Sequence, residues 1–88
     1  AYLDRIARID DAGPQISAVI ALFPDAMEQA RALDAERAAG KVRGPLHGIP
    51  VLIKDNIEVA GPVPTTAGSL ALKDNVTGRD AFLVGRLR

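Results

Sequence analysis

Cysteine is absent from this 88-residue sequence, and histidine occurs only once, as His47. The lack of cysteine excludes disulfides, thiolate chemistry and cysteine-based zinc sites, and it is compatible with a reducing compartment. A single histidine also argues against a histidine-rich metal site within the chain. We therefore expect no metal and no cofactor.

Long apolar runs and an excess of one charge are missing too. No apolar segment approaches the roughly 20 residues of a membrane-spanning helix. The 11 basic and 11 acidic residues balance, so there is no basic surface for nucleic acid or an anionic membrane. Residues 1–5 lack the basic-then-apolar order of a signal peptide, which favours a cytoplasmic protein. Only three residues are aromatic although 48% are hydrophobic, so a core would be aliphatic.

Helical patterns are present near both ends of the chain. Apolar residues one turn apart in residues 1–10 predict the end of an amphipathic helix, which Gly13-Pro14 breaks. Near the other end, Asp80 has the side chain of an N-cap. The apolar residues that follow it predict a further helix that continues to Arg88.

A longer helix is predicted for about residues 24–39. A proline suits its first position, and acidic residues near its start favour the positive end of the helix. Gly40 would end it in the left-handed conformation. Asp34 and Arg37 have the spacing of an ion pair on one face. Phe23 is an unusual residue before the helix, since its side chain cannot accept a capping hydrogen bond.

Two apolar runs predict buried strands. Residues 16–22 form a short run rich in β-branched residues, whose length favours a strand over a helix. Residues 49–54 are apolar at five consecutive positions and end at Lys54. Unbroken apolarity is typical of a strand covered on both faces, and Pro50 is tolerated only near its start.

The predicted elements point to an α/β fold class that these residues do not complete. A strand covered on both faces needs neighbouring strands and two covering layers, which two strands and three helices cannot supply. There is no initiating Met, and both ends fall inside predicted helices. We therefore expect residues 1–88 to be part of one larger domain, incomplete at both ends.

Lys54 is the most informative polar residue, because it directly follows a predicted buried strand. Burial disfavours the charged form of a lysine, and a neutral amine can act as a general base. From spacing alone, the more ordinary interpretation is a lysine that reaches solvent or pairs with Asp55 or Glu58.

Other polar residues carry weaker signals. Ser69, His47 and Asp55 have the residue types of a hydrolytic triad, but no nucleophile-elbow sequence accompanies them. A loop histidine bonded to backbone is the simpler interpretation. The hydroxyls of Thr65, Thr66 and Ser69 could bind substrate or satisfy backbone groups of their own turns. The glycines match neither a Walker nor a dinucleotide-binding pattern.

The block from Arg43 to Ile57, which contains GPLHGIPVLIKDNI, resembles the lysine motif of the amidase signature family nearly residue for residue. Residues 65–69, TTAGS, resemble the family's T-x-G-S stretch. Residues 80–87 resemble the helix that leads towards its next strand, and the helix over 24–40 has the usual place and character. The resemblance covers almost the whole chain, and the lysine block is its most specific part.

This resemblance implies a large α/β domain, a mixed β-sheet covered by helices on both sides, of which the chain would be an N-terminal portion. It also implies hydrolysis of carboxylic amides by a Ser–cis-Ser–Lys triad, in which Lys54 would be the catalytic lysine. The Gly/Ser-rich signature that carries both serines and the oxyanion hole is absent here, and Ser17 and Ser69 match neither serine. We therefore expect these residues alone to be inactive.

The implied partner is a small-molecule or peptide amide, cleaved to an acid plus ammonia or an amine. A peptide-type amidase, which we favour, needs no nucleic acid. The alternative within the family is the glutaminase subunit of a tRNA-dependent amidotransferase, which would imply protein partners and tRNA. A truncated, non-catalytic binding or structural module is the alternative outside it.

Overall fold

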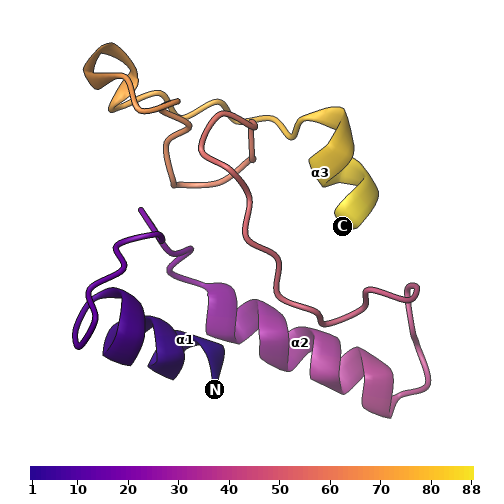
Figure 1. Ribbon diagram of the computed structural model, residues 1–88. Coiled ribbons are helices and arrows are strands. Elements are labelled where there is room, and N and C mark those ends of the chain that lie inside the picture. The colour runs from indigo at the N-terminus through magenta and orange to yellow at the C-terminus, as the bar shows by residue number, and fades with distance from the viewer.

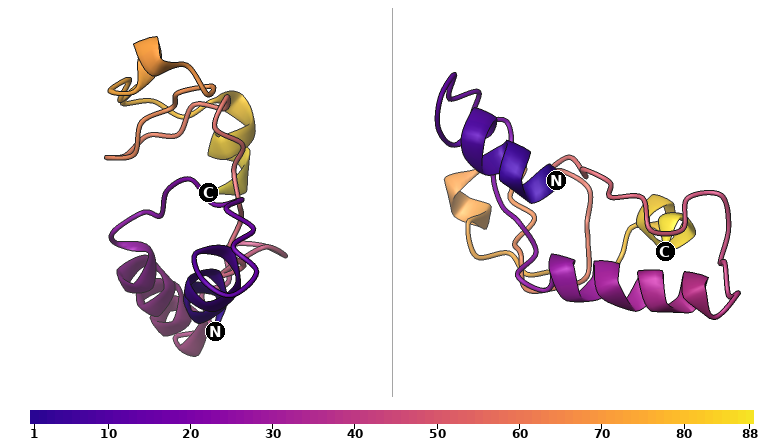
Figure 2. Two further views of the ribbon diagram at one scale, coloured as in Figure 1. Left: turned by 60° about the vertical axis from the view of Figure 1, so that its left-hand side comes forward. Right: turned by 90° about the horizontal axis from the view of Figure 1, so that it is seen from below.

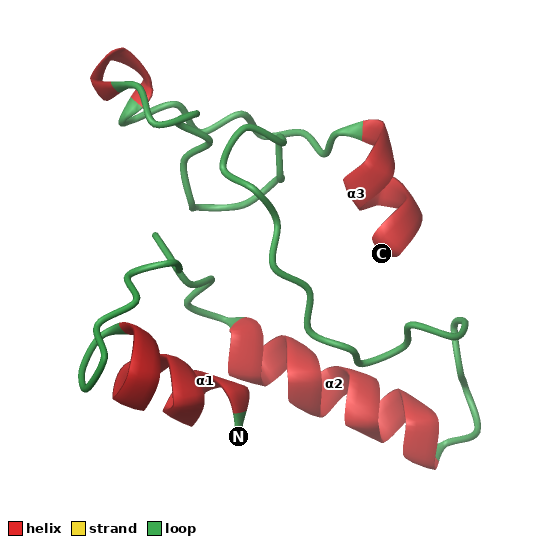
Figure 3. Cartoon of the chain, viewed as in Figure 1, coloured by secondary structure: helices red, strands yellow, loops and turns green.

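The computed structural model describes all of residues 1–88, and helices are its only regular elements (Figures 1 and 3). Helix α1 (Tyr2–Arg5) continues as a π-helical turn over Ile6–Asp10. Helix α2 (Ala26–Ala38) is the longest, a 3₁₀ turn covers Leu70–Leu72, and α3 (Phe82–Leu87) comes last. The three helices predicted from the sequence are confirmed.

The helices and loops form a flat, open arrangement. Helices α1 and α2 lie on one side of the molecule and the loops of residues 54–80 on the other (Figures 1 and 2). The segment after α2 runs back along that helix and then crosses to the loops. The radius of gyration is 14.6 Å, whereas a compact domain of this length has about 12 Å. These residues therefore do not close around a core of their own.

Neither segment for which a strand was predicted forms one. Residues 16–22 and 49–54 are irregular chain (Figure 3). A strand needs ladder hydrogen bonds from a neighbouring strand, and neither run has one. Ile20 and Leu52 are each 76% exposed, so the apolar side chains are not covered either. The predicted strands are therefore not formed within these residues, because apolar composition cannot supply a pairing partner.

The end of α2 follows the sequence prediction closely. Gly40 has a φ of 77°, in the left-handed region, and its N–H donates to the carbonyl of Arg37 at 3.0 Å. The N–H of Lys41 donates to the carbonyl of Glu36 at 2.8 Å. This pair of bonds is the Schellman motif, which satisfies carbonyls that the helix end leaves free.

The beginning of α2 is held by a contact distant in sequence. The Phe23 ring packs so closely on Gly61 that a methyl group at that glycine would overlap the ring. Asp25 occupies the N-cap position but its side chain makes no capping bond there; it accepts instead from the Gln29 amide at 3.0 Å. Phe23 therefore stands before the helix for packing, which explains its unusual place.

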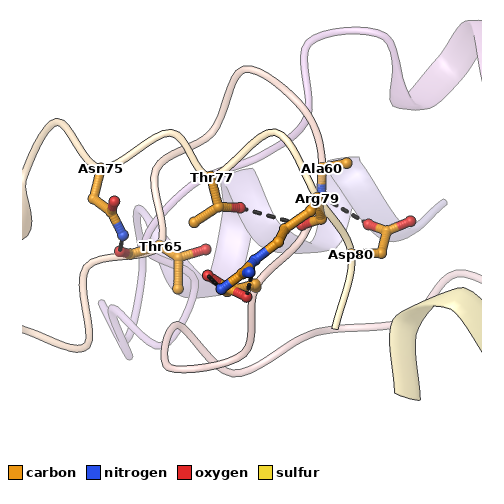
Figure 4. A network of polar contacts seen from close by, with 7 residues as sticks. Ala60, Thr65, Asn75, Thr77, Arg79 and Asp80 are labelled. Carbon is orange, nitrogen blue, oxygen red and sulfur yellow. Dashed lines mark hydrogen bonds and ion pairs between the residues drawn. The ribbon is translucent and has the colours of Figure 1, made fainter. Parts of the chain in front are cut away.

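Residues 58–60 are fastened to residues 79–81 (Figure 4). The N–H of Ala81 donates to the carbonyl of Glu58 at 2.8 Å, and the Glu58 carboxylate binds the Arg79 guanidinium through two bonds of 2.8 and 3.0 Å. The Asp80 carboxylate accepts from the Ala60 N–H at 2.7 Å. The prediction that Asp80 caps the last helix is wrong, because its carboxylate serves Ala60 while Ala81 occupies the cap.

Few side chains are buried. Val84 is the only buried apolar residue, and Asp10 and His47 are the buried polar ones. Asp10 is satisfied locally, since its carboxylate accepts from the N–H groups of Ala18 and Val19 at 2.8 and 2.9 Å. None of the helices has the length and apolar character of a membrane-spanning segment.

Candidate active site

Lys54 lies at the start of a tight turn in the loop region. The N–H of Ile57 donates to the Lys54 carbonyl at 2.9 Å, which closes the turn. The Lys54 side chain is exposed, and Leu52 is exposed as well, so the predicted desolvation by apolar neighbours is not formed within these residues. The predicted ion-pair partners are engaged elsewhere, Asp55 with Thr66 and Glu58 with Arg79. The lysine amine is therefore left free of the carboxylates beside it.

Asp55, the residue after the lysine, is bound from two sides by Thr66. The Thr66 N–H donates to Oδ1 at 2.9 Å, and the Thr66 hydroxyl donates to Oδ2. The N–H of Ala67 adds a bond of 2.9 Å to the Asp55 carbonyl. The hydroxyl bond, followed by the backbone bond, holds the pKa of Asp55 below its ordinary value. The carboxylate is thus kept as an acceptor that ties residues 54–55 to residues 66–67.

The loop that supplies Thr66 is itself well fixed. Ala67 and Gly68 have consecutive positive φ angles of 51° and 72°, and the Ser69 N–H donates to the Thr66 carbonyl at 2.9 Å. Asn75 brackets Thr65, because its carbonyl accepts from the Thr65 N–H at 3.0 Å and its side-chain amide donates to the Thr65 carbonyl at 2.9 Å (Figure 4). The Thr66 hydroxyl donates to Asp55 and accepts from the Gly68 N–H of its own turn, whereas the Thr65 hydroxyl makes no hydrogen bond.

His47 is buried and bound at both ring nitrogens. Nδ1 accepts from the Arg43 N–H at 3.2 Å, so the proton lies on Nε2, which donates to the Leu33 carbonyl at 2.8 Å. Neither Ser69 nor Asp55 bonds to this ring. The Ser69–His47–Asp55 triad is therefore not formed, and the simpler interpretation of a histidine bonded to backbone is confirmed.

Residues 43–48, the first part of the lysine motif and here called the motif loop, are also bound to α2 by charged side chains. Arg37 donates to the His47 carbonyl at 2.6 Å, and Arg43 binds the Glu36 carboxylate through two nitrogens. The hydrogen bond to Arg43 is the main cause that lowers the pKa of Glu36. The predicted pair of Asp34 with Arg37 is not formed, because Arg37 turns to the loop. Helix α2 thus acts as the support on which residues 43–48 are laid.

A cavity of about 600 Å³ lies between α2, residues 43–53 and α3. Its walls include the apolar side chains of Phe23, Leu33, Leu46, Val51, Ile53 and Val84. Lys54 does not line it, although it directly follows Ile53. No group of three His, Asp or Glu side chains is arranged to hold a metal.

Sequence reasoning singled out Lys54 as a candidate but missed the residues that hold its surroundings. Asn75 gave no signal and Arg37 was assigned to Asp34, because their actual partners lie ten residues away in loops. Asp55 did carry a sequence signal. It stands beside Lys54 and upstream of a Thr-rich turn, and the donors of such a turn can bind a carboxylate.

The sequence model of the amidase family matches residues 1–88, the whole chain. Together with the lysine motif, this match defines the class of protein. The chain belongs to the amidase signature family.

Particular relatives sharpen this assignment. The native peptide amidase from Stenotrophomonas maltophilia is 56% identical, with a TM-score of 0.92 over 99% of this chain and 18% of its own. A glutamyl-tRNA(Gln) amidotransferase subunit from Nitratidesulfovibrio vulgaris is 49% identical over 100% of this chain and 18% of its own. A Schizosaccharomyces pombe protein named as an amidase is 45% identical over 99% of this chain and 14% of its own. The open helix-and-loop arrangement is therefore that of the matching part of an amidase fold, and the chain spans less than a fifth of the length of these relatives.

Proposed function

We propose that these residues are the lysine-bearing part of an amidase, with Lys54 as the catalytic lysine of a Ser–cis-Ser–Lys triad. The observation that carries the proposal is the lysine motif, in a chain that matches the amidase family throughout and has the backbone of a peptide amidase. The engagement of Asp55 and Glu58 by other partners supports it, because it leaves the lysine amine available.

The remainder of the domain would supply what is not in this chain. The apolar runs 16–22 and 49–54 would join a mixed sheet covered by helices, which would provide the ladder partners that they lack here. The exposed apolar side chains and the cavity beside α2 support this, since exposed apolar surface of this kind marks a face that another part covers. The same covering would exclude water around Lys54.

The chemistry would proceed by two linked proton transfers. The Lys54 amine takes the proton of the bridging serine hydroxyl, which takes the proton of the nucleophilic serine as that oxygen bonds to the amide carbonyl carbon. The proton returns along the same path to the leaving nitrogen as the C–N bond breaks, which leaves a serine ester. Water then adds to the ester carbonyl and releases the acid and the serine hydroxyl.

Peptide amides are the substrate class that we favour. The basis is the 56% identity to a peptide amidase. A peptide amidase of the same identity to this chain forms a complex with the competitive inhibitor chymostatin. The second candidate is the glutaminase subunit of a tRNA-dependent amidotransferase, favoured by 49% identity over the whole chain to a protein of that kind. Ammonia release from a peptide amide without tRNA or a partner protein supports the first; glutamine hydrolysis that requires both supports the second.

The first experiment is the intact mass of the natural polypeptide. A mass several times the 9.3 kDa of this chain supports a complete amidase, whereas a mass near 9.3 kDa supports a non-catalytic module. In the complete enzyme, Lys54→Ala is expected to lower kcat by about 10³-fold or more with the fold retained. Lys73→Ala is the matched control, because Lys73 is an exposed lysine that pairs only with Asp74. A near-normal kcat in the Lys54→Ala enzyme would contradict the proposal.

A further inference from the structure

We propose that Asp55 and Thr66 are positioning residues that hold the backbone of Lys54 in place for proton transfer. The inference rests on the proposed function, because it assigns a role to the groups around Lys54 and not to the lysine itself. We call the set of hydrogen bonds between Asp55 and residues 66–67 the clasp.

The clasp fixes both the backbone and the side chain of the residue next to the lysine. Thr66 donates to both carboxylate oxygens of Asp55, from its N–H and from its hydroxyl, and the Ala67 N–H donates to the Asp55 carbonyl. The Gly68 N–H donates to the Thr66 hydroxyl oxygen at 3.1 Å. The hydroxyl therefore has one donor and one acceptor partner, which sets its direction.

The other side of Lys54 is fixed as well. The Lys54 carbonyl accepts from the Ile57 N–H at 2.9 Å, so the lysine Cα lies between a closed turn and the clasp. Its side chain makes no ion pair. The position of the amine thus depends on the anchored backbone, and a misplacement of about 1 Å can cost about 100-fold in rate.

The clasp has a second effect on the lysine. Both oxygens of Asp55 are occupied by Thr66, so the carboxylate beside Lys54 is not used to bind its amine. The loop that carries Thr66 is independently fixed, through Ser69 and through Asn75, which brackets Thr65. The clasp therefore ties the residue next to Lys54 to a well-fixed loop that is distant in the chain.

The test compares Thr66→Val with Thr66→Ser in the complete enzyme, with ammonia release from an N-acetylated dipeptide amide as the assay. Valine has the shape of threonine but no hydroxyl, whereas serine keeps it. Thr66→Val is expected to lower kcat by about 10- to 100-fold with KM unchanged, and Thr66→Ser to restore most of kcat. Asp55→Asn should resemble Thr66→Val. Thr77→Val is the control, because it removes a hydroxyl bonded only within its own turn, to the Arg79 carbonyl.

Unchanged kcat in a folded Thr66→Val enzyme would overturn the inference. A raised KM with unchanged kcat would also overturn it, since the hydroxyl would then bind substrate. The Lys54→Ala variant, measured beside these, separates the two proposals. If Lys54→Ala abolishes turnover and Thr66→Val does not change it, only the clasp is wrong; if Lys54→Ala is active, the proposed function is wrong.

Discussion

Nε2 of His47 donates to the carbonyl oxygen of Leu33 across 2.8 Å, which ties the motif loop to the middle of α2. The opposite ring nitrogen accepts from the Arg43 N–H, and the His47 carbonyl accepts from Arg37. A buried imidazole with both nitrogens engaged is a structural link and has no free position for a substrate. His47 therefore shapes the lysine motif without taking part in chemistry.

Replacement of His47 should accordingly affect stability and not turnover. His47→Ala leaves the Arg43 N–H without its acceptor and is expected to lower the free energy of unfolding by about 1–3 kcal/mol. His47→Asn places an oxygen near the position of Nδ1 and should recover part of the loss. Urea unfolding of the complete protein measures both. A large fall in kcat for folded His47→Asn, with stability retained, would instead assign chemistry to the ring.

Gly61 should tolerate no larger side chain. Its φ of 150° is one that L-residues rarely adopt, and a Cβ there would overlap the Phe23 ring. We expect Gly61→Ala to lower the free energy of unfolding by about 1–3 kcal/mol. Gly44→Ala is the matched control, because nothing lies near a Cβ at that position. Equal thermal unfolding midpoints for the two variants would contradict the packing of Phe23 on Gly61.

Gly40 isolates the contribution of backbone conformation alone. Its φ is 77° but a Cβ would contact nothing, so the expected loss in Gly40→Ala is about 1 kcal/mol from the left-handed conformation. Gly40→Asn should lose less, since asparagine enters this region more readily. Chemical unfolding of both variants gives the comparison. An alanine variant as stable as the parent would show that α2 does not need this ending.

The lowered pKa of Asp80 predicts that the free energy of unfolding falls at acid pH. The Ala60 N–H, with the Arg88 guanidinium as a lesser contributor, holds the pKa of Asp80 below its ordinary value in the folded chain. Its contribution is therefore fully present above the unfolded pKa of about 3.9 and is lost as the pH falls through the lower folded value.

Asp80→Asn tests this sign. The difference in free energy of unfolding between the parent and the variant should be constant above about pH 5 and should shrink below about pH 4. Arg88→Gln should keep most of the acid dependence, because the Ala60 N–H is the larger cause. A parent–variant difference that stays constant down to about pH 2 would contradict the assignment.

Local rules explain which structural predictions succeeded. Helix α2 and its end at Gly40 depend on residues within a few positions of each other, through helical propensity and the left-handed preference of glycine. The clasp lies beyond such rules, because Asp55 and Thr66 are far apart in the chain and only the fold shows that they meet. The predicted strands are not formed here for a related reason. A strand needs a second segment as its hydrogen-bonding partner, and an apolar run does not identify that partner.

The lysine motif of the amidase family can be read directly from residues 43–57, because that block is specific residue by residue, and the end of α2 follows from Gly40 alone. The partners of the polar side chains depend on the folded chain: Asp80 bonds to Ala60 and not to its own helix, and Arg37 bonds to His47 and not to Asp34. The physical reason is that a side-chain donor or acceptor has several possible partners of similar strength. Only the folded path of the backbone brings one of them within hydrogen-bonding distance.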